Sequence, residues 1–123
     1  MHSVLFVDDE PNVSRVARLA LERAGYEVEV AHNGEEGLER IRGREFDVII
    51  TDVQMPKMDG REMCRQMREE FPDRKPIVFV ITARSELEFR EWALDLPDCE
   101  FIHKPVSLRH MIERIQGHLG PLA

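Results

Sequence analysis

The chain has 123 residues, of which 42% are apolar and 33% charged, so it is long enough for one domain with a buried core (residues 1–123) and is not disordered. Acidic residues outnumber basic residues by 24 to 17, and the net charge of −7 argues against unaided DNA binding, which needs a basic face. Two cysteines are too few for a disulfide framework. No apolar run resembles a signal peptide or a membrane span, so we expect a cytoplasmic protein.

Strand patterns alternate with helix patterns along the chain. Short β-branched runs predict strands at residues 3–7, 26–31, 48–51, 77–81 and 101–103. Apolar residues at helical spacing predict helices between Pro11 and Gly25, at 37–42, between Gly60 and Pro72, at 86–96, and after Ser107. Asn33-Gly34 is interpreted as a turn. Five strands alternating with five helices predict an α/β fold, a parallel sheet covered on both faces.

Polar side chains stand where the predicted strands end. Asp8 and Asp9 follow the first strand, Asp52 the third, Thr82 the fourth and Lys104 the fifth. Because ligands of such sheets bind beyond the carboxyl ends of the strands, we expect these side chains to share one site. Each has an ordinary alternative: acids before a helix are favoured by its dipole, and most lysines are solvated.

The predicted site has the composition of a magnesium centre. Three converging carboxylates repel one another and raise each other's pKa unless a cation lies among them. Oxygen ligands without histidine or cysteine suit Mg²⁺. Lys104 is held between a strand and a proline, so its ammonium group can pair with Asp52 in the empty site and with phosphoryl oxygens in the filled site. Ala83 is small and leaves room for that group beside Thr82.

Taken together, these motifs identify a family resemblance over essentially the whole chain. The chain resembles the receiver domain of two-component response regulators in the acid pair Asp8-Asp9, in Asp52 with the following Val53-Gln54-Met55-Pro56-Lys57-Met58-Asp59-Gly60, in Thr82-Ala83 and in Lys104-Pro105. The resemblance implies a flavodoxin-like, doubly wound sheet of strand order 2-1-3-4-5 with five helices.

The resemblance also implies roles for the site residues. Asp52 would be the phosphoacceptor, assisted by Thr82 and Lys104, which would bind the phosphoryl oxygens. Mg²⁺ or Mn²⁺ would be held by Asp9, Asp52 and the backbone carbonyl of Gln54, with Asp8 acting through water. The domain would not be an enzyme with a separate substrate, but a switch that assists its own phosphorylation and dephosphorylation.

A conformational switch and its partners follow from the same resemblance. Phe101 takes the place of the commoner tyrosine that moves inward with Thr82, remodelling the face formed by the helix at 86–96, the strand at 101–103 and the last helix. The implied partners are a sensor histidine kinase or phosphotransfer protein and an effector domain or downstream protein, with a possible homodimer through that face. Neither nucleic acid nor membrane is expected to bind this domain.

Two other functions remain open at this point. A receiver-shaped interaction module that is never phosphorylated would need none of the acids, Thr82 or Lys104. An aspartyl-phosphate phosphohydrolase would carry a second acid two residues after the nucleophile, where this chain has Gln54.

Overall fold

A computed structural model describes residues 1–82, 99–104 and 106–120. Its elements, in chain order, are β1 Ser3–Val7, α1 Pro11–Arg23, β2 Glu27–Ala31, α2 Gly34–Gly43, β3 Val48–Asp52, α3 Gly60–Glu70, β4 Ile77–Thr82, β5 Glu100–His103 and α5 Leu108–Leu119. The five strands are parallel in the order β2-β1-β3-β4-β5, which confirms the predicted sheet. Four of the five predicted helices fall within the described residues, and the one predicted at 86–96 lies outside them.

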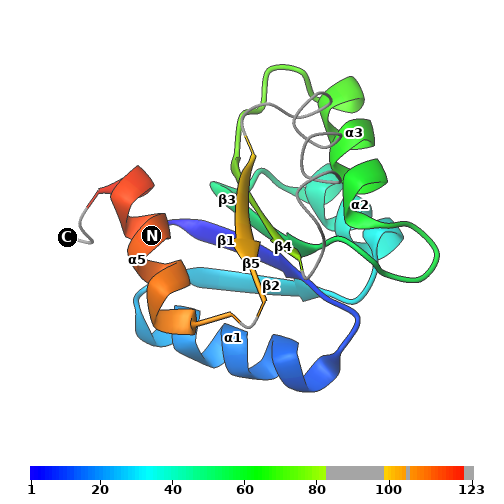
Figure 1. Ribbon diagram of the computed structural model, residues 1–123. Helices are drawn as coiled ribbons and strands as arrows, with labels where there is room; N and C mark the ends of the chain where they lie inside the picture. The colour runs from blue at the N-terminus through cyan, green and yellow to red at the C-terminus, as the bar shows by residue number, and fades with distance from the viewer. Residues whose placement is uncertain (83–98, 105, 121–123) are drawn as a thin grey trace.

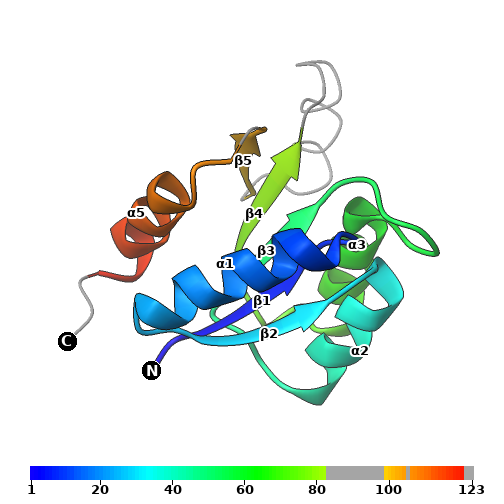
Figure 2. The same ribbon diagram turned by 90° about the horizontal axis from the view of Figure 1, so that it is seen from below.

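The sheet separates two apolar layers (Figures 1 and 2). Helices α1 and α5 cover one face, and α2 and α3 cover the other. Because side chains alternate along a strand, β1 sends Val4 and Phe6 to the α1/α5 layer and Leu5 and Val7 to the α2/α3 layer. β1 is buried throughout, as the unbroken apolar run 3–7 predicts for a central parallel strand.

Helix α2 begins earlier than its apolar periodicity indicates. The side chain of Asn33 accepts a hydrogen bond of 2.8 Å from the backbone N–H of Glu36, so Asn33 is the N-cap and Gly34 is the first helical residue. The interpretation of Asn33-Gly34 as a turn is therefore wrong, and the helix predicted at 37–42 spans Gly34–Gly43. Asp59 and Ser107 cap α3 and α5 in the same way.

The surface of α1 differs from that of a fully amphipathic helix. Ser14, Ala17 and Leu21 form its buried line. Val13 and Val16 share the helical spacing but remain 40% and 56% exposed. They line an apolar groove of about 770 Å³ between α1 and the start of α5.

Two further sequence predictions concern the cysteines and membrane-spanning helices. Cys64 and Cys99 are free thiols, as their number and spacing indicate. Among the helices of residues 1–82, 99–104 and 106–120, none has the length and apolar character needed to cross a bilayer.

Candidate functional site

The carboxyl ends of the central strands bring three acids together. Asp8 and Asp9 directly follow β1, and Asp52 is the last residue of the neighbouring strand β3. Each of these three side chains offers a carboxylate oxygen, and the three oxygens all lie within 4.8 Å of one another. Asp8 and Asp52 are buried, while Asp9 is exposed. Asp52 thus forms one cluster with two acids that precede it in the chain by 43 and 44 residues.

Lys104 closes the site from the other side. Its Nζ donates a hydrogen bond of 3.0 Å to Oδ2 of Asp52, whose side chain is 11% exposed. Its backbone N–H donates to the carbonyl oxygen of Thr82 at 2.9 Å. This hydrogen bond continues the β4–β5 pairing and fixes the backbone position from which the Lys104 side chain extends. Partial burial lowers the pKa of Lys104, but the hydrogen bond and charge of Asp52, with the charges of Asp8 and Glu10, outweigh it and raise the pKa.

The surroundings of Asp8 disfavour its ionised form. Burial raises its pKa, and the charges of Asp52 and Asp9 add to the increase, while a hydrogen bond of 2.9 Å from the N–H of Glu10 and the charge of Lys104 oppose it. A buried acid beside two others gains from a neighbouring cation. With oxygen donors only, the cluster fits a hard divalent ion such as Mg²⁺.

Asp52 has a second fixed contact at its strand end. Its Oδ1 accepts a hydrogen bond of 2.7 Å from the N–H of Val53, so the carboxylate is held between this N–H and Lys104. The carbonyl oxygen of Asp52 accepts a hydrogen bond of 2.8 Å from the buried hydroxyl of Thr51. Backbone and side chain of Asp52 are therefore both anchored, which orients its carboxylate toward the pocket.

The loop from β3 to α3 forms the remaining wall. Gly60 N–H donates to the carbonyl oxygen of Val53 at 2.9 Å, and a methyl group on Gly60 would overlap the carbonyl oxygen of Asp52. Lys57 has a φ of 68°, and Met58 N–H returns to the carbonyl oxygen of Pro56 at 2.8 Å. This tight turn keeps the loop close to the acids.

Acids, amide, hydroxyl and ammonium line one small polar hollow. Its volume is about 230 Å³, and its walls are Asp9, Glu10, Asp52, Val53, Gln54, Thr82 and Lys104. The structure therefore places six of the residues singled out from the sequence (Asp8, Asp9, Asp52, Gln54, Thr82 and Lys104) at one location. Ala83 lies outside the described residues. Glu10 was missed, although its place directly after the acid pair is a signal that could have revealed it.

Phe101 lies outside this hollow but on a connected surface. It pairs with Val80 of β4 and packs, half-buried, against the α2/α3 layer. Thr82 follows Val80 by two residues, so strand alternation directs Thr82 and Phe101 to the same face of the sheet. The helix predicted at 86–96, which would complete the switch face, lies outside the described residues.

Comparison with known proteins agrees with this geometry. Residues 4–116 match the family model described as the response regulator receiver domain. The chain belongs to this family. Response regulator ArlR of Staphylococcus saprophyticus is 34% identical over 119 residues, covering 97% of this chain and 53% of ArlR. Response regulator MprA of Mycobacterium ulcerans is 39% identical over 116 residues, covering 94% of this chain and 49% of MprA. The receiver thus spans about half the length of these curated relatives.

Solved receiver structures share the whole fold. A CheY-like receiver domain protein from Methanospirillum hungatei superposes with a TM-score of 0.87 at 29% identity, covering 97% of this chain and 94% of that one. Chemotaxis protein CheY4 of Vibrio cholerae superposes with a TM-score of 0.86 at 30% identity, covering 95% and 98%. This agreement confirms the flavodoxin-like arrangement of the receiver.

Proposed function

We propose that this receiver works in a phosphorelay, with Asp52 accepting a phosphoryl group from the phosphohistidine of a sensor kinase or phosphotransfer protein. The observation that carries the proposal is the ion pair between Asp52 Oδ2 and Lys104 Nζ, 3.0 Å long, inside a cluster of three carboxylates. A structural ion pair would need no further acids beside it, whereas phosphoryl transfer needs a nucleophile, a cation site and a counter-charge in one place.

The chain's own residues supply the parts of the transfer. A carboxylate oxygen of Asp52 attacks phosphorus in line with the bond to the donor nitrogen, that bond breaks, and its electron pair stays on the donor imidazole. Lys104 exchanges its contact with Asp52 for contacts with the phosphoryl oxygens, and the hydroxyl of Thr82 donates to a third oxygen. Water later attacks the phosphorus of the acyl phosphate, the bond from phosphorus to the Asp52 oxygen breaks, and inorganic phosphate leaves as the carboxylate of Asp52 is restored.

The acid cluster has the donors for a divalent ion. Asp9, Asp52 and the carbonyl oxygen of Gln54 would hold Mg²⁺ or Mn²⁺, with Asp8 acting through a water molecule. When bound, the ion neutralises charge on the transferring group and on the acids around it. The 4.8 Å grouping of carboxylate oxygens and the place of Gln54 beside Asp9 and Asp52 support this ligand set.

The domain would pass its signal to other proteins through the surface around β5 and α5, not through the pocket itself. Phosphorylation draws Thr82 toward the phosphoryl group, and Phe101 fills the space that Thr82 leaves, which shifts a pre-existing equilibrium of the surface around β5 and α5. We propose that this surface regulates an effector domain or a downstream protein in the cytoplasm and that it can form a homodimer. Nucleic acid would then be bound by the effector and not by this acidic domain.

The test is phosphorylation of Asp52→Asn. This variant keeps the shape of the side chain but removes the nucleophilic carboxylate, so labelling by a small phosphodonor such as acetyl phosphate in Mg²⁺ should be lost. Asp73→Asn, at an exposed position in the connection from α3 to β4, is the matched control and should be labelled like the wild type. Label that persists on Asp52→Asn would refute the assignment of the phosphoacceptor.

Two alternatives give different results in the same experiment. An interaction module would neither bind Mg²⁺ nor be labelled in the wild-type form. An aspartyl-phosphate phosphohydrolase would release phosphate from many monoester molecules per protein. Such an enzyme needs a general acid at the position of Gln54, whose amide has no acidic proton.

A further inference from the structure

We propose that Gly34, at the start of α2, is a positioning residue that sets the affinity of the acid cluster for Mg²⁺. This inference rests on the proposed function. Gly34 lies on an element that contributes no side chain to the pocket. It acts through its contact with the loop that carries Gln54.

The contact is a direct hydrogen bond between two otherwise separate segments. The backbone N–H of Gly34 donates to the carbonyl oxygen of Met58 at 2.9 Å. The first N–H groups of a helix have no partner within the helix, so Gly34 can use its N–H in this way. The first N–H of α3, that of Gly60, holds the carbonyl oxygen of Val53. Two helix starts thus hold the two ends of the segment that contains Gln54.

The approach is too close for any other residue. A methyl group on Gly34 would overlap the carbonyl oxygen of Met58 and would lie 2.8 Å from its carbonyl carbon. These are backbone atoms, so rotation of a side chain cannot relieve the overlap. Either α2 or the loop has to move.

The packing decides which of the two moves. Leu38 and Ile41 of α2 are both 2% exposed in the core, and the space beside Gly37 is closed by the side chain of Met63 from α3. In the loop, Met58 is only half-buried against the core, and Gln54, Pro56, Lys57 and Asp59 are exposed. The loop therefore shifts, and it carries with it Gln54, which lines the hollow beside Asp9 and Asp52.

The experiment compares two glycines of the same helix. Gly34→Ala should bind Mg²⁺ about tenfold more weakly than the wild type by calorimetry, as expected when a residue behind a metal ligand is changed. Gly43→Ala is the matched control, since an added methyl group there meets no atom within 4 Å, and its Mg²⁺ affinity should equal that of the wild type. Equal Mg²⁺ affinity of folded Gly34→Ala and Gly43→Ala would overturn the proposal.

A second measurement needs no variant. If the contact from Gly34 to Met58 favours Mg²⁺ binding, Mg²⁺ must in turn strengthen the contact, because the coupling is reciprocal. Hydrogen exchange of the Gly34 amide in the wild type should then slow when Mg²⁺ is added. The Gly37 amide, which donates to the carbonyl oxygen of the N-cap residue Asn33 at 2.9 Å, should change less. Equal responses of the two amides would contradict the role of Gly34.

The outcomes also separate this inference from the proposed function. If the wild-type protein binds no Mg²⁺, the proposed metal site does not exist, and the role of Gly34 is refuted with it. If the wild type binds Mg²⁺ and is labelled on Asp52, but Gly34→Ala has no effect, the proposed function stands. Only the role of Gly34 is then refuted.

Discussion

At the scale of single residues, Lys104 is the group on which the charge balance of the pocket depends. It pairs with Asp52 and lies close enough to Asp8 and Glu10 for their charges to contribute to its raised pKa. Its side chain is 41% exposed, so water screens the pair and its contribution to folding stability is small. In the proposed transfer, its role would be to follow the negative charge as it moves from the carboxylate to the phosphoryl group.

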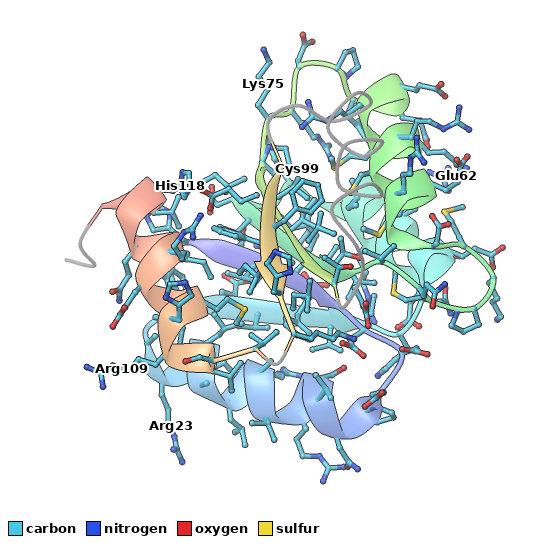
Figure 3. The ribbon with its side chains drawn as sticks, viewed as in Figure 1. Arg23, Glu62, Lys75, Cys99, Arg109 and His118 are labelled. Carbon is cyan, nitrogen blue, oxygen red and sulfur yellow. The ribbon has the colours of Figure 1, made fainter. Side chains whose placement is uncertain are left out.

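Removal of this ammonium group should affect transfer and not folding. We expect Lys104→Ala to lower the rate of phosphorylation by acetyl phosphate about a hundredfold, the usual cost of losing one group that stabilises the transition-state charge. The melting temperature should stay close to that of the wild type. Lys75→Ala is the control, because Lys75 is exposed (Figure 3) and precedes β4, whose opposite end carries Thr82 of the pocket. An unchanged rate in Lys104→Ala would exclude a role for Lys104 in transfer.

At the scale of elements, an ion-pair cluster fastens α5 to the start of β5. Glu100 of β5 accepts a hydrogen bond of 2.7 Å from Arg114 through Oε1, and its Oε2 lies 3.0 Å from Nε2 of His118. The ring of His118 meets the ring of the buried Phe79 edge-on, with centroids 5.8 Å apart. The cluster joins the strand that carries Phe101 to the last helix, both parts of the proposed switch surface.

This cluster gives a pH-dependent prediction. Partial burial opposes ionisation of Glu100, but Arg114 and His118 outweigh it and lower its pKa below the ordinary value of 4.5. A lowered carboxyl pKa means that the folded state binds fewer protons than the unfolded state, so this stabilisation is present above pH 4.5 and is lost as the pH falls through the lowered pKa. We expect Glu100→Gln to lose roughly 1 kcal/mol of unfolding free energy at pH 7.

The measurement is denaturant unfolding at several pH values. The difference between Glu100→Gln and the wild type should shrink in acid, as Glu100 itself becomes protonated. Glu113→Gln is the matched control on α5, since the pair of Glu113 with Arg109 is 3.4 Å long and Arg109 is 91% exposed, pointing away from the body of the molecule (Figure 3). A difference that stays constant from neutral to acid pH would show that the charge of Glu100 is not the cause.

At the scale of the whole molecule, the excess of acidic residues affects the stability of the fold. The net charge is −7, and three of the 24 acids meet at one strand edge, two of them buried. The raised pKa of Asp8 means that its ionised form costs folding free energy at neutral pH. A cation bound at the site would offset this cost and raise the free energy of unfolding. That residues 1–123 form one domain stays a prediction.

Magnesium should therefore stabilise the entire fold. At a Mg²⁺ concentration of 100 times Kd, we expect the unfolding free energy to rise by about 2.7 kcal/mol, the value for a ligand that binds only the folded state. NaCl at equal ionic strength is the control for general screening of the acids, and Asp9→Asn should lose most of the Mg²⁺ effect. If NaCl stabilises the wild type as much as Mg²⁺ does, the acids form no specific metal site.

Most strands and helices of this molecule can be predicted from the local spacing of apolar residues. The β-branched runs and helical spacings predicted all five strands and the four helices that fall within the described residues, because both periodicities are properties of short segments. The polar residues at the strand ends were identifiable for the same reason, since parallel strands must present their carboxyl ends at one edge. The exact start of α2 was not, because Asn33-Gly34 suits both a turn and a cap.

Only the tertiary structure decided how the segments meet. The 3.0 Å pairing of Lys104 with Asp52, the exposure of Val16 and the contact of Gly34 with Met58 depend on which layers lie against one another. By itself, the sequence determined which groups stand at the ends of strands, because that depends on neighbours along the chain. Distances between distant groups were decided by packing of helices on the sheet, a property that no single segment contains.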